Sequence, residues 1–185
     1  SADARPTVRV RFAQRIFFFV STLCRSSCSS VCLQMVLLKE IDSHGFIIYT
    51  NAISQKGQDM VANPQASMLL YWPSLGRQLR IEGAVEPVSS DTSDAYFASR
   101  SRGSQLAAAA SRQSAPMRSR DELLQRLHAI EEAHPGQVPR PETWGGWRLV
   151  PRRIEFWSDG SHRLHMRESY RLSGVDKWER ELQQP

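Results

Sequence analysis

The chain has 185 residues, of which 41% are hydrophobic and 23% are charged, and its formal net charge is +5. These proportions are typical of a globular protein large enough to bury the core of one domain, and they exclude a chain dominated by disorder. The basic residues are scattered and form no Lys/Arg block, so no nucleic-acid-binding tail is predicted, and local arginine clusters fit small phosphorylated ligands equally well.

Residues 1–34 differ in composition from the rest of the chain. The apolar run at residues 16–24 resembles a signal peptide, but it is too short to span a membrane and lacks a small-residue cleavage pattern. The three cysteines, Cys24, Cys28 and Cys32, are odd in number and have no histidine nearby, which argues against a disulfide framework and a zinc site. We therefore expect no metal, no membrane association and a cytoplasmic location, with an organelle as the alternative.

From residue 35 onward, the sequence predicts strands. Apolar runs at residues 35–41 and 46–50 flank Ser43-His44-Gly45, a combination typical of a hairpin. Ser54 can cap a short helix that ends before Pro64, because proline disfavours helical backbone in the residue before it. The N-terminus of such a helix is suited to bind phosphate. Two further strands are predicted at residues 67–72 and 78–88.

Helices are predicted in the middle of the chain. Residues 90–100 place apolar and small side chains at helical spacing, and residues 105–111 are rich in alanine, which favours helix intrinsically. Ser119 and Glu122 form a capping-box pattern in front of an apolar run that ends at His134-Pro135-Gly136. We expect this last helix to serve as scaffold.

Residues 144–167 combine three tryptophans with several cationic side chains. Asp159-Gly160 lies between alternating runs at residues 154–157 and 162–165, which predicts a tight hairpin whose turn needs positive φ. Because strand side chains alternate between faces, three side chains are expected on one face of the second strand, namely Arg163, His165 and Arg167. Two permanent cations and an imidazole on one face predict an anion-binding site.

The whole pattern consists of about six antiparallel strands with helices inserted between them, and such a pattern suits a small closed barrel because closure removes exposed strand edges. The last strand is expected near residues 178–182. The expected fold class is therefore mainly β, antiparallel, with inserted helices.

Several motifs also occur together in the order found in one enzyme family. They are M-V-L-L-K (residues 35–39), Y-T-N (49–51), Y-F-A-S-R (96–100), S-Q (104–105), R-Q-S (112–114), W-G-G-W (144–147), I-E-F-W (154–157) and H-R-L-H-M-R (162–167). On these motifs the chain resembles the pyridoxamine 5'-phosphate oxidases from residue 35 to about residue 178. The resemblance implies an FMN-binding split β-barrel that acts as a homodimer, with both active sites at the subunit interface.

The same resemblance assigns FMN contacts to Arg9, Lys39, Tyr49, Thr50, Ser54, Gln55, Lys56, Gln78, Gln113, Ser114, Trp157 and Arg167. The early residues, up to Lys56, and the late residues, from Gln113 on, are expected to come from opposite subunits. Gln55 stands in place of a family arginine, and Arg9 is separated from Met35. At about 1.5–3 kcal/mol for each charged hydrogen bond, losing two phosphate cations would weaken FMN binding by roughly two to four orders of magnitude.

Substrate contacts are assigned by resemblance to Lys39, Tyr96, Arg100, Ser104, Arg163 and His165, with Arg163 and His165 as the catalytic candidates. Tyr96 and Arg100 are four residues apart, so they would share one face of a helix. Arg163 keeps its charge, whereas a histidine such as His165 can change charge near neutral pH. The implied reaction is oxidation of pyridoxamine or pyridoxine 5'-phosphate by O2 to pyridoxal 5'-phosphate, with H2O2 and, from the amine, ammonia as products.

Residues 10–34 interrupt the family pattern, whose two halves stand at residues 4–9 and 35–39. The interrupting segment is rich in Phe, Ser, Cys, Leu and Val, whose codons are pyrimidine-rich, so we hypothesise a translated intron, which sequencing of the mature transcript would test. The expected division is an atypical segment, residues 1–34, and a split-barrel domain, residues 35–185. The alternative functions are an inactive or weakly FMN-binding isoform and a non-catalytic flavin-binding or pyridoxal-phosphate-binding protein.

Overall fold

A computed structural model of the chain describes residues 16–20 and 32–185. Arg9, Cys24 and Cys28 lie outside the described residues, as does much of the segment of residues 10–34. The hypothesis of a translated intron therefore stays a hypothesis. Part of the segment nevertheless forms a strand, β1 (Ile16–Val20), that pairs with both β2 (Cys32–Val36) and β5 (Gln65–Trp72).

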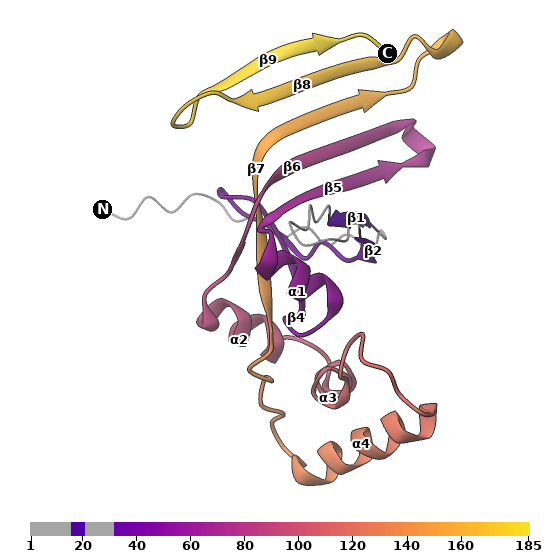
Figure 1. Ribbon diagram of the computed structural model, residues 1–185, viewed down its shortest axis with the longest axis vertical. Coiled ribbons are helices and arrows are strands. Elements are labelled where there is room, and N and C mark those ends of the chain that lie inside the picture. Colours follow the sequence, from indigo (N-terminus) through magenta and orange to yellow (C-terminus); the bar gives the residue numbers. More distant parts are fainter. Residues whose placement is uncertain (1–15, 21–31) are drawn as a thin grey trace. The chain divides into compact units, whose positions relative to one another are not determined.

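Nine strands of the described residues form a sheet in the order β2-β1-β5-β6-β7-β4-β3, with β8 beside β7 and β9 beside β8 (Figure 1). The remaining strands are β3 (Glu40–Ile41), β4 (Phe46–Asn51), β6 (Arg77–Pro87), β7 (Trp144–Ser158), β8 (Met166–Leu172) and β9 (Trp178–Gln183). The hairpin predicted around Ser43-His44-Gly45 is confirmed, because β3 pairs antiparallel with β4. The single strand expected at residues 35–41 is wrong, because β2 ends at Val36 and β3 begins at Glu40.

The helices follow the predicted order. They are α1 (Gln55–Ala62), α2 (Ser90–Ala98), α3 (Arg102–Ala110) and α4 (Arg120–Ala133), with short 3-10 turns η1 (Pro73–Leu75) and η2 (Ser161–Arg163). Ser54 caps α1 as predicted, since its Oγ accepts a hydrogen bond from the Gly57 N–H at 3.2 Å. Ser119 likewise caps α4 by accepting from the Glu122 N–H at 3.3 Å. Among the described helices, none combines the length and the apolar character that crossing a membrane requires.

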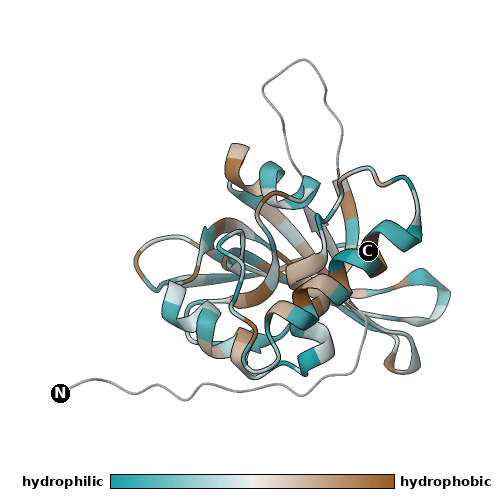
Figure 2. Cartoon of the chain, turned by 90° about the horizontal axis from the view of Figure 1, so that it is seen from below, coloured by the Kyte–Doolittle hydropathy of each residue, from teal (hydrophilic) through white to brown (hydrophobic). Residues whose placement is uncertain are grey.

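The chain divides into two compact units. The first unit comprises the chain up to Ile48 together with Asp59–Glu86 and Arg148–Pro185, and the second comprises Tyr49–Gln58 and Pro87–Trp147. The first unit therefore holds most of the sheet, and the second holds α2, α3 and α4. Hydrophobic and hydrophilic residues are interspersed along the strands and helices, as expected for elements with one buried face (Figure 2).

The core of the first unit is built from alternating strand residues. In β5 the residues Ala66, Met68 and Leu70 are buried, and Met68 lies opposite the equally buried Ile81 of β6. The β5–β6 connection turns at Gly76, whose φ of +56° favours glycine. The sequence prediction of these two strands is thus confirmed, and burial of alternate side chains accounts for their pairing register.

The core of the second unit consists of Phe97, Leu106, Val138 and Trp144, with Leu127 and Ile130 of α4 packed against it. Apolar side chains at helical spacing on α2, α3 and α4 supply most of these residues. Trp144 begins β7, so the strand contributes one large aromatic side chain to a core that is otherwise mostly helical. The scaffold role expected for α4 is consistent with this packing.

The hairpin predicted around Asp159-Gly160 exists, but its loop differs from the prediction. Trp157 pairs with Arg167 and Ser158 with Met166, so the connection comprises residues 159–165 and includes η2. The strand expected at residues 162–165 is therefore wrong. Gly160 has φ −139°, and the positive φ values occur at His162 and Arg163. Gly160 is required for a different reason, since a Cβ there would lie 2.1 Å from the Leu164 carbonyl oxygen.

Candidate functional site

A buried lysine lies at the start of the second unit. Lys56 is 3% exposed, and its Nζ donates a hydrogen bond to Thr50 Oγ1 at 2.9 Å. Thr50 Oγ1 in turn donates to Gln113 Oε1 at 3.1 Å, which also accepts from the Asn51 N–H at 3.3 Å. The structure therefore brings together an ammonium, a hydroxyl and an amide from three segments of the chain. Such donors suit an anionic ligand.

Three other predicted cofactor residues lie near this lysine in sequence or beside Gln113. Ser54 is fully buried, and its hydroxyl donates to the Asn51 carbonyl oxygen at 2.6 Å, so a phosphate contact would have to replace that bond. Gln55 is exposed on the first turn of α1, and Ser114 is exposed with φ +68°. The Thr50 hydroxyl likewise already donates, to Gln113 Oε1, so the Lys56 ammonium is better placed than either hydroxyl to offer a donor to a ligand.

An aromatic stack occupies the same unit. Tyr49 stacks on Tyr96 at 3.8 Å between ring centroids with an interplanar angle of 16°, and Trp144 is nearly parallel to both. Gly146 allows this arrangement, because a Cβ at that position would lie 2.8 Å from the Tyr49 ring. Close packing against Tyr49 thus explains why the second glycine of the W-G-G-W motif cannot carry a side chain. The sequence showed the motif but not the contact that requires it.

Arg100 lies against this stack. Its Cζ is 4.8 Å from the Trp144 ring centroid and 5.6 Å from that of Phe97, both within cation–π range. Its Nη1 is buried without a hydrogen-bond partner in the described part of the chain, and burial lowers the pKa of the Arg100 guanidinium. An unsatisfied buried donor costs about 1–3 kcal/mol, so an anionic oxygen at Nη1 would relieve this penalty.

The expectation that Tyr96 and Arg100 share a helix face is wrong in detail. Helix α2 ends at Ala98, and the Arg100 N–H donates to the Phe97 carbonyl oxygen at 3.2 Å in the turn that follows. Both side chains nevertheless approach Trp144, so tertiary packing brings Tyr96 and Arg100 near each other although they do not share a helix. Ser104 lies on the first turn of α3 and accepts a hydrogen bond from Ser101 Oγ at 2.9 Å.

In the first unit, the β7–β8 connection brings Trp157 and His165 together. Their ring centroids are 4.7 Å apart, and His165 Nδ1 lies 3.1 Å from Asp159 Oδ1. Arg163 is exposed in η2 with φ +66°. The prediction that Arg163, His165 and Arg167 share one face of a strand is therefore wrong, because only Arg167 belongs to β8.

Arg167 is held by the buried carboxylate of Glu155. Its Nε and Nη2 each lie 3.1 Å from a Glu155 oxygen, and its Nη1 donates to the Gln184 carbonyl oxygen at 3.2 Å. Arg80 Nη2 also binds Glu155 at 2.7 Å, and Arg153 Nη2 lies 3.5 Å away. Burial raises the pKa of Glu155, but the hydrogen bond from Arg167 and the charges of the three arginines outweigh it and lower that pKa.

The two remaining predicted residues also lie in the first unit. The Lys39 N–H donates to the Ile47 carbonyl oxygen at 3.0 Å between β2 and β3, and Gln78 pairs with Tyr71 across β5 and β6. Both side chains are half-buried. Glu155 and Asp159, which bind Arg167 and His165, were missed by the sequence analysis. The only sequence signal for them is their position inside or beside the E-F-W and H-R-L-H-M-R motifs.

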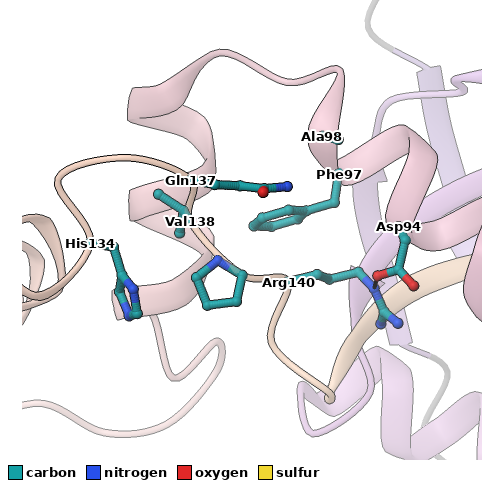
Figure 3. A pocket seen from close by; sticks show the side chains of 8 residues that line it. Asp94, Phe97, Ala98, His134, Gln137, Val138 and Arg140 are labelled. Carbon is teal, nitrogen blue, oxygen red and sulfur yellow. Dashed lines mark hydrogen bonds and ion pairs between the residues drawn. The ribbon is translucent and has the colours of Figure 1, made fainter.

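A surface pocket of about 620 Å³ lies between α2 and the segment of residues 134–140 (Figure 3). It is lined by Asp94, Phe97, Ala98, His134, Gln137, Val138, Pro139 and Arg140. The Arg140 guanidinium is already paired within the protein, since its Nε binds Asp94 Oδ1 at 2.6 Å and its Nη1 donates to the Trp144 carbonyl oxygen. None of the predicted substrate residues lines this pocket. Among the described residues, no group of three or more His, Cys, Asp and Glu side chains is arranged to hold a metal ion.

Comparison with known proteins identifies similar sequences and structures. Residues 4–134 match the family model described as pyridoxamine 5'-phosphate oxidase, and residues 144–185 match the pyridoxine 5'-phosphate oxidase C-terminal dimerisation region. The pyridoxine/pyridoxamine 5'-phosphate oxidase of Rhodopseudomonas palustris (strain BisB18) is 50% identical over 145 residues, which cover 78% of this chain and 68% of that protein. The enzyme of the same name from Thermosynechococcus vestitus is 49% identical over 147 residues, covering 80% and 69%.

Two solved structures are similar in fold. PhzG from Burkholderia lata 383, solved with tetrahydrophenazine-1-carboxylic acid, has a TM-score of 0.84 and 30% identity, covering 92% of this chain and 82% of that one. A pyridoxamine 5'-phosphate oxidase-related, FMN binding protein from Nostoc punctiforme has a TM-score of 0.72 at 14% identity, covering 95% and 90%, and at that identity shows the fold alone. These likenesses confirm the expected fold class, a mainly β, antiparallel split barrel with inserted helices.

Proposed function

The chain belongs to the pyridoxamine 5'-phosphate oxidase family, and we propose that it oxidises pyridoxamine or pyridoxine 5'-phosphate to pyridoxal 5'-phosphate. For the amine, one molecule each of substrate, water and O2 gives one molecule each of aldehyde, ammonia and H2O2. For the alcohol, substrate and O2 give the aldehyde and H2O2. Relatives of about 50% identity that carry this name support the proposal.

The observation that carries the proposal is the buried Nη1 of Arg100, which lies beside Trp144 in the same aromatic stack as Tyr96. A substrate phosphate is a dianion, and a guanidinium binds its oxygens in a defined geometry. The Tyr96 hydroxyl would add a second donor for the same group. The resemblance adds Lys39, Ser104, Arg163 and His165 as further substrate contacts, which remain part of the proposal.

The residues present also fit FMN as the cofactor. Lys56, Thr50 and Gln113 form a connected hydrogen-bonded set beside Tyr49, in which Lys56 donates to Thr50 and Thr50 donates to Gln113, and this set matches the needs of a phosphate and a flat ring. Bound FMN would supply the two-electron acceptor that no amino-acid side chain provides. The remaining cofactor assignments belong to the proposal as well, namely Lys39, Tyr49, Ser54, Gln55, Gln78, Ser114, Trp157 and Arg167.

The roles of this chain's own residues follow from their chemistry. Arg100 and Tyr96 would bind the phosphate end and so help to fix the position of the substrate, and with it that of the reacting C4' carbon. Lys56 and Thr50 would hold the cofactor phosphate by charge and hydrogen bonding. His165 would accept a hydrogen bond from the amine or hydroxyl at C4', and Arg163 would contribute positive charge near the substrate.

The test compares Arg100→Met with Arg118→Met, a matched loss of an exposed arginine beyond α3. Each variant is titrated with FMN and then assayed for H2O2 and for the aldehyde product at saturating FMN. We expect unchanged FMN affinity in both variants, and for Arg100→Met a raised KM and a loss of about 2–5 kcal/mol in kcat/KM, the range for truncating a buried charged contact. A parent chain that binds FMN but forms no H2O2 would favour the non-catalytic alternative.

A further inference from the structure

The loop between β7 and β8 holds His165 in a defined position. His165 Nδ1 lies 3.1 Å from Asp159 Oδ1, and the imidazole packs against the Trp157 ring at 4.7 Å. The Asp159 N–H donates to the Gly76 carbonyl oxygen at 2.7 Å, which ties the start of the loop to the turn after η1. His165 immediately precedes β8, so backbone pairing fixes the other end.

Two groups lie within hydrogen-bond distance of His165 Nδ1, the Gly160 N–H and Asp159 Oδ1, and the distances indicate which of them Nδ1 pairs with. The Gly160 N–H points at Nδ1 from 3.3 Å, but it also donates to Asp159 Oδ1 at the shorter distance of 3.0 Å. If Nδ1 carried no proton, its lone pair would face a carboxylate oxygen at 3.1 Å, which is repulsive. With a proton on Nδ1, the imidazole donates a charge-assisted hydrogen bond to Asp159, and Asp159 still accepts from Gly160.

We propose that Asp159 is a positioning residue that keeps the proton of His165 on Nδ1, so that Nε2 presents a lone pair to the amine or hydroxyl of the substrate. This inference rests on the proposed function for the identity of the substrate, but its statement about His165 does not. The tautomer of a histidine is commonly set by the hydrogen bond that its other nitrogen makes. A histidine with the proton on Nε2 could not accept a hydrogen bond from the substrate at that nitrogen.

The loop is built to keep this pair together. A Cβ at Gly160 would lie 2.1 Å from the Leu164 carbonyl oxygen, so a larger residue would open the turn between Asp159 and His165. A Cβ at Gly76 would lie 3.0 Å from Asp159 Cβ, so the neighbouring turn also approaches Asp159 closely. Asp159 is exposed, with 64% of its side chain accessible, so its replacement removes a partner of His165 without creating a cavity.

The first test reads the tautomer directly by nitrogen NMR of the full chain with labelled histidine, which needs neither substrate nor FMN. The His165 signals are assigned among the five histidines by their loss in His165→Gln. We expect the Nδ1–H tautomer in the parent chain and a mixture or the Nε2–H tautomer in Asp159→Asn and Asp159→Ala. Asp176→Asn, a change in the exposed β8–β9 loop, serves as the control. An unchanged tautomer in Asp159→Ala overturns the inference.

The second test is kinetic, at saturating FMN. Asp159→Ala should lower kcat/KM by about 10- to 100-fold, as when a partner that orients a metal-binding histidine is lost, and Asp159→Glu should recover part of this loss. A tautomer change with unaltered kcat/KM would overturn the positioning role. A parent chain without oxidase activity would instead contradict the proposed function, and the NMR result would still decide what Asp159 does to His165.

Discussion

Glu155 is a buried carboxylate surrounded by three arginine side chains. Its carboxylate is 6% exposed and binds Arg80, Arg153 and Arg167, which come from three different strands. Removing the charge of such a carboxylate leaves three cations facing one another with weaker acceptors. The network also fixes Arg167, a proposed FMN contact, so a cofactor would meet an arginine whose three nitrogens already have partners.

We predict that Glu155→Gln lowers the free energy of unfolding at neutral pH by about 1.5–3 kcal/mol, the scale of a hydrogen bond to a charged group. The pKa of Glu155 is lowered in the folded protein, so the unfolded state binds the proton more readily. This contribution is therefore fully present above the unfolded pKa and is lost as pH falls through the folded pKa. Urea denaturation at a series of pH values should show the difference between parent and variant shrinking toward acid.

The control for Glu155 is Glu179→Gln on β9. Glu179 also faces a cation, since Lys177 Nζ lies 3.6 Å from its Oε1, but its side chain is 60% exposed, so solvent screens the pair. We expect little change in unfolding free energy for this variant. Equal losses in the two variants would mean that burial of Glu155 is not what makes its network stabilising.

For individual residues, the sequence indicated which side chains belong to the candidate site, but it did not indicate which side chains they contact. Trp157 and Arg167 stood out because they belong to a long motif, and the structure places both in the β7–β8 hairpin. Their partners could not be predicted, since Glu155 and Arg167 meet only through the cross-strand register, and His165 meets Asp159 only through η2. Contacts of this kind depend on tertiary geometry that local patterns do not carry.

Strands β6 and β7 approach each other unusually closely at Gly83. A Cβ at that position would lie 1.9 Å from the Val150 carbonyl oxygen, which is backbone and cannot rotate away. The two strands are neighbours in the sheet that carries the β7–β8 hairpin. Gly83 is therefore required by a close approach, and its φ does not lie in the left-handed region.

We predict that Gly83→Ala destabilises the protein by about 1–3 kcal/mol, the usual range for overpacking a tightly packed site. The measurement is the midpoint of thermal or urea unfolding. Gly174→Ala is the matched control, because a Cβ there would meet nothing within 4 Å. If both alanine variants unfold at the same midpoint as the parent, the strands can separate at Gly83 without penalty and the argument from close approach fails.

The sequence predicted the elements well where local chemistry decides them. Ser54 and Ser119 cap helices as their types and positions indicated, and β5 and β6 follow the apolar pattern. The prediction failed for the Asp159-Gly160 turn, because a dipeptide that favours a two-residue loop is overridden here by pairing of Ser158 with Met166. It also failed where β2 and β3 divide, since a continuous apolar run does not show where pairing changes.

For the molecule as a whole, the proposed ligand residues divide between the two compact units. Tyr49, Thr50, Lys56, Arg100 and Gln113 belong to the second unit, and Trp157, His165 and Arg167 belong to the first. The expectation that the early and late residues serve a flavin from opposite subunits stays a prediction, and within one chain Gln113 Oε1 accepts a hydrogen bond from Thr50 Oγ1 at 3.1 Å. Sequence periodicity carries no information on which subunit supplies a contact.

A homodimer is supported by the match of residues 144–185 to a C-terminal dimerisation region. The β7–β8–β9 register places Phe156 opposite Glu168 and Glu168 opposite Leu182, and Ser158 opposite Met166, so these side chains share one face of the sheet. Phe156, Met166 and Leu182 are 50–61% exposed on that face. A second copy of this chain would bury them, and in a two-fold interface every residue contributes twice.

We predict that Phe156→Asp together with Leu182→Asp shifts the chain from dimer to monomer in light scattering. Burying a large apolar side chain contributes about 1.5–3 kcal/mol, so two such losses in each subunit should raise the dissociation constant by several orders of magnitude. Val175→Asp, at a fully exposed position in the β8–β9 connection, should leave the dimer intact. Because the resemblance places both active sites at the subunit interface, the monomeric variant should also bind FMN more weakly. A monomer that keeps the parent's FMN affinity would show that one chain supplies the whole cofactor site, and a variant that remains dimeric would assign the interface to another face.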